Sequence, residues 1–370
     1  MNHLLFDQLT PALPDRYKAM SDEALQQEAR RLRRELGSRL FLPGHHYQRE
    51  EVIQFADVTG DSLQLARQSA ARPEADFIIF LGVHFMAETA DMLTPPEQRV
   101  ILPDLRAGCS MADMADDAQC EQAWEALTER YGDTIIPVTY VNSSAAVKAF
   151  VGRYGGTTVT SSNAAKVMAW AYAQKKRVLF LPDQHLGRNT AYRSGMPRRR
   201  MAVWDPIRRE LTPDVPDASL DDATLLLWRG HCSVHENFRM EHIDEFRGSD
   251  PERRILVHPE CTWEVTEAAD FAGSTSYIID QIASAPAGTK WAVGTEMNLV
   301  RRLADQHPEQ SIVSLNPDMC PCLTMNRIDL PHLVWVLDEA AVGRVVHEIR
   351  VPETTAADAR LAIDRMMALG

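Results

Sequence analysis

One strand–helix pattern occurs three times along the chain, and this repeat constrains the fold more than any other feature of the sequence. In each copy an aliphatic run typical of a strand ends in polar residues and leads into a short hydroxyl-rich segment that can start a helix. A second strand follows, and a third strand ends close to a cysteine. Short aliphatic runs that alternate with Ala-rich helical runs indicate parallel α/β sheets.

The three copies correspond segment by segment, although their spacing is unequal. The first strands are expected at 39–48, 134–144 and 254–265, the hydroxyl segments at 57–66, 158–167 and 270–279, the second strands at 75–82, 176–184 and 290–296, and the third at 99–113, 223–238 and 311–326. The cysteines near the third strands are Cys109, Cys232, and Cys320 or Cys322. Open parallel sheets bind ligands at the carboxyl ends of their strands, so three converging units would bring these cysteines to one crevice.

The repeat also predicts the domain boundaries. Leu25, Leu32 and Leu36, with charged residues between them, predict an amphipathic helix that ends before Gly37. The expected parts are an N-terminal helical cover over 1–37, a first α/β domain over 38–133 joined by C-terminal helices in 331–370, a second over 134–250 with an insertion near 187–210, and a third over 251–330.

Composition and charge narrow the class of function. The 370 residues are 45% apolar and 25% charged, which is typical of a globular protein with a large core. The net charge of −13 disfavours a nucleic-acid or anionic-membrane binder. The sequence has neither a leader pattern at its start nor an apolar run of the ~20 residues that cross a bilayer. We therefore expect a cytoplasmic protein that acts on small molecules.

Six cysteines are too few for a disulfide scaffold, so those in the repeat are candidate metal ligands. A single free cysteine is more often a small buried apolar residue, but three in parallel contexts favour a shared role. Three thiolates suit either a zinc with an open site, for which His235 is a further candidate ligand, or an iron–sulfur cluster with one iron lacking a protein ligand. Spacing alone does not decide between them. Nucleotide-binding loops of the GxxxxGK[ST] or GxGxxG type are absent from the sequence.

Many short motifs together resemble the quinolinate synthase family, over nearly the whole chain. In order they are HHYQ (45–48), TGDS (59–62), AGCSMADM (107–114), TYVNSS (139–144), TSSNA (160–164), GHCSVHENF (230–238), VHPEC (257–261), GSTS (273–276), GTEMN (294–298) and CPCLTMN (320–326). The resemblance implies three αβα domains in a pseudo-threefold arrangement around a central [4Fe-4S] cluster. It also implies condensation of iminoaspartate with dihydroxyacetone phosphate to quinolinate, with loss of phosphate and water, in de novo NAD biosynthesis.

The resemblance implies one cluster ligand from each domain. Cys109 and Cys232 match the first two ligands of the family. The third is expected six residues before Asn326, which is Cys320, with Cys322 as its neighbour. Cys120 and Cys261, which have no counterpart in the repeat, are expected to have packing roles.

The resemblance also implies roles for polar residues after the strands. His45, Tyr47, Tyr140 and Glu260 are the expected catalytic residues, with the tyrosines as proton carriers or donors and Glu260 as the proton-shuttling carboxylate of raised pKa. The residues expected to bind substrate are His45, Ser62, Tyr140, Asn142, Ser161, His235, His258, Glu260, Ser274 and Thr275. Capping of helix N-termini, the structural alternative for the hydroxyl residues, is compatible with anion binding.

The sequence is compatible with two other functions: a zinc hydrolase or aldolase that uses Cys232, His235 and a further cysteine, and an iron–sulfur sensor that responds to oxygen. No HExxH motif supports the first, and no basic recognition segment supports the second. The expected partners are small-molecule substrates, with transient contact to an L-aspartate oxidase, in a monomer or homodimer. The arginines of 198–209 are expected to be solvated, with attraction of anionic substrates as the alternative.

Overall fold

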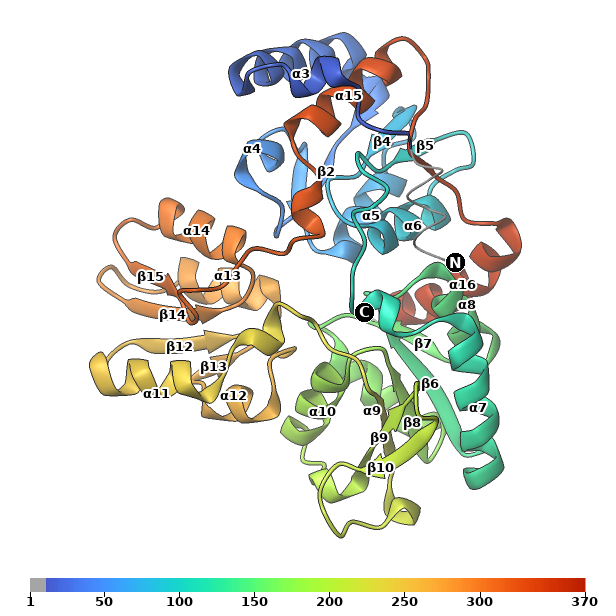
Figure 1. Ribbon diagram of the computed structural model, residues 1–370. Helices are drawn as coiled ribbons and strands as arrows, with labels where there is room; N and C mark the ends of the chain where they lie inside the picture. Colours follow the sequence, from blue (N-terminus) through green and yellow to red (C-terminus); the bar gives the residue numbers. More distant parts are fainter. Residues whose placement is uncertain (1–10, 370) are drawn as a thin grey trace. The chain divides into compact units, whose positions relative to one another are not determined.

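The computed structural model describes residues 11–369 (Figure 1). The chain divides into two compact units. The first unit runs to Cys109 and includes Pro321–Pro352, and the second consists of Ser110–Cys320 and the segment that starts at Glu353. Residues 1–10 of the expected N-terminal cover lie outside the described part. Within residues 11–369, no helix is both long and apolar enough to cross a membrane.

The first unit is built on a short sheet. Its strands are β1 (Leu40–Phe41), β4 (Phe77–Ile79), β5 (Arg99–Ile101) and β16 (Glu348–Ile349) in that order, with a parallel pair of β2 (Pro43–His45) and β3 (Val58–Gly60). All neighbours are parallel except β16, which runs antiparallel to β5. The helices of this unit are α2 (Asp15–Lys18), α3 (Asp22–Leu36), α4 (Glu50–Ile53), α5 (Ser62–Ala70), α6 (His84–Leu93) and α15 (Leu330–Ala341), with 3₁₀ turns η1 (Gly37–Arg39) and η6 (Met325–Arg327).

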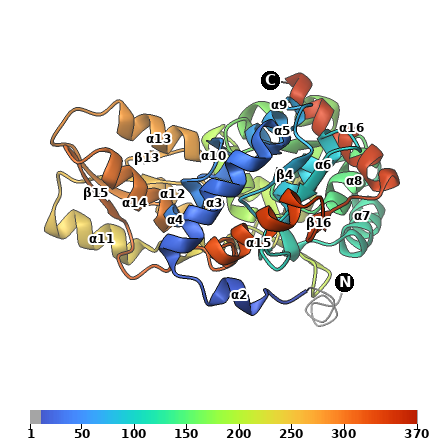
Figure 2. The same ribbon diagram turned by 90° about the horizontal axis from the view of Figure 1, so that it is seen from above.

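Helix α3 has the predicted bounds and ends at Gly37, whose positive φ of 56° favours glycine. Its buried face contains Leu25, Leu32 and Leu36 and packs along α15 (Figure 2). The expectation of an amphipathic helix at 22–36 is therefore confirmed.

The second unit contains a six-stranded sheet. Its order is β10 (Glu210–Pro213), β9 (Met201–Asp205), β11 (Leu225–Trp228), β8 (Arg177–Leu181), β6 (Ile135–Tyr140) and β7 (Thr157–Val159). All pairs are parallel except β10 and β9, an antiparallel pair at one edge that forms part of the expected insertion. The helices around it are α7 (Asp117–Tyr131), α8 (Ala145–Arg153), α9 (Ala164–Gln174), α10 (Gln184–Arg193) and α16 (Glu353–Leu369), with 3₁₀ turns η2 (Ala112–Met114), η3 (Arg198–Arg200), η4 (Leu220–Asp222) and η5 (His235–Asn237).

A four-stranded, all-parallel sheet completes the second unit. Its order is β13 (Phe271–Ala272), β12 (Arg254–Val257), β14 (Lys290–Gly294) and β15 (Ser311–Ser314). Helices α11 (Met240–Ser249) and α12 (Trp263–Ala268) lie on one side of it, and α13 (Thr275–Ala283) and α14 (Met297–Gln306) lie on the other (Figure 1).

The three copies of the repeat have related strand orders. In the second unit, β6 lies between β7 and β8 with β11 beyond β8, and β12 lies between β13 and β14 with β15 beyond β14. In the first unit, β2 pairs with β3 and bridges through Gly44 to Leu81, just after β4, and β5 lies beyond β4. Three short strands were not predicted: β3, β7 and β13. They lie at the starts of the hydroxyl segments, where only a helix start was expected. The prediction of an α/β fold with short, mostly parallel sheets is confirmed.

The division of the chain differs from expectation at both ends of the first domain. Helix α7, expected in the first domain, packs its buried Cys120, Ala123 and Leu127 with Phe150 and Trp228 of the second unit. The C-terminal helix α16, expected to join the first domain, packs on α8 and β7 instead, whereas α15 lies in the first unit. An apolar helix face can pack on any sheet, so the hydrophobic pattern of α7 did not identify which sheet it contacts.

The close approach of α16 to α8 requires Gly152. A Cβ at this position would lie 1.9 Å from the backbone oxygen of Asp358. We predict that Gly152→Ala destabilises the second unit by about 1–3 kcal/mol, because backbone must move to make room. The check is the midpoint of urea unfolding followed by circular dichroism.

Gly248→Ala is the matched control for this substitution. Gly248 is also a helical glycine of the second unit, and a Cβ there meets nothing within 4 Å. Alanine should therefore stabilise α11 by up to about 1 kcal/mol. Equal midpoints for the two variants would contradict the assigned packing of α16 on α8.

Candidate functional site

The centre of the site is the carboxylate of Glu260, which is 3% exposed and lies in the loop after β12. A fully buried carboxylate is stable only with hydrogen-bond donors or opposite charges beside it. Glu260 has such neighbours from two different segments: Oε2 is 2.9 Å from Nδ1 of His235, and the side chain of Tyr140 also hydrogen-bonds to it. A further hydrogen bond stabilises the loop of Glu260, because the backbone N–H of Glu260 donates to Nδ1 of His258 at 3.3 Å.

His235 belongs to η5, after β11, and both of its ring nitrogens have partners. Nδ1 faces Glu260, and Nε2 lies 3.2 Å from Oγ1 of Thr295, the residue after β14. The ring stacks on that of His258, with 4.5 Å between ring centroids and 20° between planes. Tyr140 is the last residue of β6, and His235, His258 and Thr295 follow β11, β12 and β14, so all four lie at the carboxyl ends of strands, as the sequence predicted for all but Thr295.

The charge of Glu260 is set by opposing effects. Burial raises the pKa of Glu260, but the rings of His258 and His235 and the hydrogen bonds from His235 and Tyr140 lower it more, to about 2. Burial lowers the pKa of His258 to about 3, so this ring is neutral. The low pKa of Glu260 differs from the expectation of a raised pKa: the groups around it lower the pKa, so the side chain is an ionised carboxylate rather than a neutral acid.

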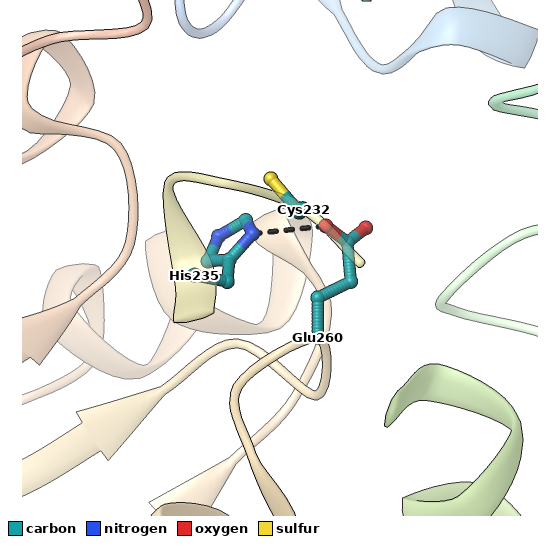
Figure 3. Close-up of side chains that lie close together, drawn as sticks. All are labelled: Cys232, His235 and Glu260. Carbon is teal, nitrogen blue, oxygen red and sulfur yellow. Dashed lines mark hydrogen bonds and ion pairs between the residues drawn. The ribbon is translucent and has the colours of Figure 1, made fainter. Parts of the chain in front are cut away.

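Cys232 lies beside the hydrogen-bonded side chains of His235 and Glu260. One atom each from Cys232, His235 and Glu260 lies within 4.8 Å of the others, so the three form a possible metal-binding group (Figure 3). His235 is a poor ligand in this arrangement, because Nδ1 is engaged by Glu260 and Nε2 by Thr295. In this group the sulfur of Cys232 and the carboxylate of Glu260 are better suited than the imidazole to contact a metal or a substrate.

The loop after β6 is fixed by a buried lysine that the sequence analysis did not single out. Lys148 of α8 has no exposed surface, and its ammonium group donates to the backbone oxygen of Ser143. The hydroxyl of Ser143 in turn donates to the backbone oxygen of Tyr140 at 2.8 Å, and Thr139 donates to that hydroxyl at 3.0 Å. These bonds hold the loop that contains Tyr140 and the half-buried Asn142.

The remaining hydroxyl residues of the second unit lie at helix starts. Ser274 is the N-cap of α13, where its hydroxyl accepts from the N–H of Tyr277 at 3.3 Å, and Thr275 is the first residue of that helix. Both are nearly buried, whereas Ser161, two residues before the N-cap of α9, is half-buried. Glu296 also has a capping role, since Oε2 accepts from the N–H groups of Asn298 and Leu299.

The candidate residues of the first unit form a local group of their own. His45 is the last residue of β2 and is buried, and its Nδ1 accepts from the N–H of Tyr47 at 3.1 Å. The two rings meet edge to face with centroids 4.8 Å apart. Ser62 is the buried first residue of α5, whose N-cap is Asp61. Cys109 ends the first unit and is half-buried.

The loop of the third copy favours Cys322 over Cys320 as the counterpart of Cys232. Cys109, Cys232 and Cys322 each lie three residues before a 3₁₀ turn. The backbone oxygen of Cys232 accepts from the N–H of Glu236, and that of Cys322 accepts from the N–H of Asn326, both at 3.0 Å. Cys322 is also half-buried like the other two, whereas Cys320 is exposed. This register differs from the sequence expectation, which counted back from Asn326 to Cys320.

The two remaining cysteines are fully buried, in agreement with the expected packing role. Cys120 lies in α7, and Cys261 follows Glu260 with its sulfur 3.8 Å from the backbone oxygen of Gly294. Burial raises the pKa of both thiols well above the ordinary value. Neither is therefore suited to be a thiolate ligand.

We predict that Lys148→Met lowers the free energy of unfolding by about 1–3 kcal/mol, because the backbone oxygen of Ser143 loses a charged donor in a buried place. Lys166→Met, on the exposed side of α9, removes the same charge and should change stability by no more than about 0.5 kcal/mol. Thermal unfolding of both variants checks this. Equal shifts would mean that the buried ammonium does not hold the loop.

Comparison with known proteins gives one consistent result. The sequence model of a family described as "Quinolinate synthetase A protein" matches residues 27–368. The chain is 60% identical over 368 residues to the quinolinate synthase of Anoxybacillus flavithermus, with 100% of both chains covered. It is 60% identical to that of Geobacillus thermodenitrificans and 58% identical to that of Bacillus anthracis, with 96% of each chain covered.

Proposed function

Because the chain belongs to the quinolinate synthetase A family, we propose that it condenses iminoaspartate with dihydroxyacetone phosphate to quinolinate, with loss of phosphate and water. This reaction is a step of de novo NAD biosynthesis. The observation that supports it best is the buried, ionised Glu260, hydrogen-bonded by His235 and Tyr140 beside the sulfur of Cys232. A condensation followed by dehydration needs a carboxylate that accepts and returns protons.

We propose Cys109, Cys232 and Cys322 as the ligands of a [4Fe-4S] cluster. Each of these cysteines lies three residues before a 3₁₀ turn and is half-buried. These common features fit a role as ligands, because such a cluster needs three equivalent thiolates. Two contacts within the second unit lie near proposed ligands. The hydroxyl oxygens of Ser110 and Ser233, each the residue after a proposed ligand, lie 3.4 Å apart. The side-chain amide of Asn316 donates to the backbone oxygen of Asn237 at 3.2 Å. Such a cluster supplies an iron with an open position, which acts as a Lewis acid on a substrate hydroxyl or carboxylate.

The residues of this chain supply the proton transfers and the anion sites. Glu260 accepts a proton from the substrate and returns it to a departing hydroxyl, while His235 and Tyr140 keep the carboxylate in place and Tyr140 supplies an O–H donor. The neutral His258 ring holds the loop of Glu260 and limits its movement. Thr295 fixes His235 from the other side.

Hydroxyl residues at helix starts provide the anion sites of the proposal. Ser161, Ser274 and Thr275, with the N–H groups that helix N-termini present, suit substrate carboxylates and phosphate. Asn142 is assigned to substrate binding, as are His45 and Ser62 of the first unit, and Tyr47 is assigned to proton transfer. The proposal includes a cytoplasmic location, iminoaspartate delivered by transient contact with an L-aspartate oxidase, and a monomer or homodimer.

The assay that tests the proposed function is quinolinate formation by anaerobically purified protein given iminoaspartate and dihydroxyacetone phosphate, with iron and sulfide measured on the same sample. About four irons and four sulfides per chain, with quinolinate formed, are expected. Zinc without sulfide, and no quinolinate, would instead favour a mononuclear metal site at Cys232 and Glu260.

Cysteine variants test the ligand assignment. We predict that Cys109→Ala, Cys232→Ala and Cys322→Ala each abolish assembly of the cluster, because a three-thiolate site with one ligand missing does not hold it. Cys320→Ala, two residues from Cys322, is the matched control and should retain iron and sulfide. Loss of iron in the Cys320 variant together with its retention in the Cys322 variant would restore the assignment made from sequence.

A further inference from the structure

Asp183 is a fully buried carboxyl group to which the reaction outlined above gives no role. It follows β8 and is the N-cap of α10, where Oδ1 accepts from the backbone N–H of His185 at 2.7 Å. Its other oxygen, Oδ2, is buried and has no hydrogen-bond partner in the described part of the chain. A buried oxygen without a partner is unfavourable, so it marks a position that a ligand or a bound water completes.

Capping of α10 does not explain this second oxygen. A side-chain cap needs only one acceptor oxygen. Three other aspartates cap helices in this chain, and all three are partly or fully exposed to water: Asp61, Asp116 and Asp329. Among these four aspartates, Asp183 alone is fully buried. Arg188 of α10, a cation that acts electrostatically on Asp183, is engaged by Asp214, with Nη2 2.7 Å from Oδ1.

The segment that contains Asp183 and α10 contacts both loops that form the site. On one side, the N–H of Gln184 donates to the backbone oxygen of Gly230 at 3.0 Å, and a Cβ at Gly230 would lie 2.2 Å from the oxygen of Pro182. Gly230 therefore allows the Cys232 loop to approach Asp183 closely. On the other side, Asn189 of α10 donates to the backbone oxygens of Pro259 and Cys261, at 2.9 and 2.8 Å. These bonds hold the loop of Glu260 against the same helix.

The electrostatic surroundings agree with this position. Burial raises the pKa of Asp183 well above its ordinary value, and the negative charge of Glu260 raises it further. Asp183 and Glu260 are thus two carboxyl groups in one buried region, with donors directed at Glu260 and Oδ2 of Asp183 left open.

We propose that Asp183 is a positioning residue of the reaction: its Oδ2 forms a hydrogen bond with the water or substrate hydroxyl that exchanges a proton with Glu260. In that exchange the proton passes from the bound O–H group to the Glu260 carboxylate, and Asp183 fixes the direction of the O–H bond. The inference rests on the proposed function, since it assigns a group to the same reaction.

Asp183→Asn tests the inference, because asparagine keeps the capping oxygen and replaces Oδ2 by an amide nitrogen. We expect kcat for quinolinate to fall about 10- to 100-fold, with KM for dihydroxyacetone phosphate within twofold of the parent and with iron content and melting temperature unchanged. Asp183→Ser, which keeps a capping hydroxyl and removes the second oxygen, should show the same fall. Asp116→Asn, at the exposed N-cap of α7, is the matched control and should leave kcat unchanged.

Two results would count against the role of Asp183. Parent-like kcat in the Asn and Ser variants would overturn it, and so would a fall in kcat that only parallels loss of iron or of folded protein. If the parent itself forms no quinolinate, the proposed function fails and this inference fails with it.

Discussion

The hydrogen bond between His235 and Glu260 is the interaction on which the rest of the site depends. It joins the loop after β11 to the loop after β12, which belong to different sheets of the second unit. Thr295 and Tyr140 extend it to the ends of β14 and β6. Four strand ends are therefore linked through two side chains, and a change at either one leaves a buried polar group without its partner.

This linkage also determines the chemistry that the site can perform. Burial by itself favours the neutral form of a carboxyl group, but the donors and histidine rings around Glu260 reverse that preference. The result is a carboxylate kept away from water and held in one orientation beside Cys232. A carboxylate held in one orientation needs little reorganisation when a proton reaches it during the proposed reaction.

Much of this arrangement could be predicted from sequence, because strand ends and their polar residues are local features. The repeat, α3 and the polar segments at strand ends followed from the hydrophobic pattern, and the family resemblance singled out Tyr140, His235, His258 and Glu260 within them. Features that depend on tertiary contacts did not follow: the partner of α7 and α16, the lowered pKa of Glu260, and the role of Lys148. Cys320 and Cys322 are two residues apart, so only the backbone geometry before η6 distinguished them.

The central claim is that the ionised Glu260 performs the proton transfers. It is tested most directly by the rate of quinolinate formation in Glu260→Gln, compared with the parent at matched iron and sulfide content. Glutamine preserves the size of the side chain but cannot accept a proton, so the account predicts a fall in kcat of about 10²–10⁴-fold with the cluster retained. A variant with full cluster content and a parent-like rate would contradict it.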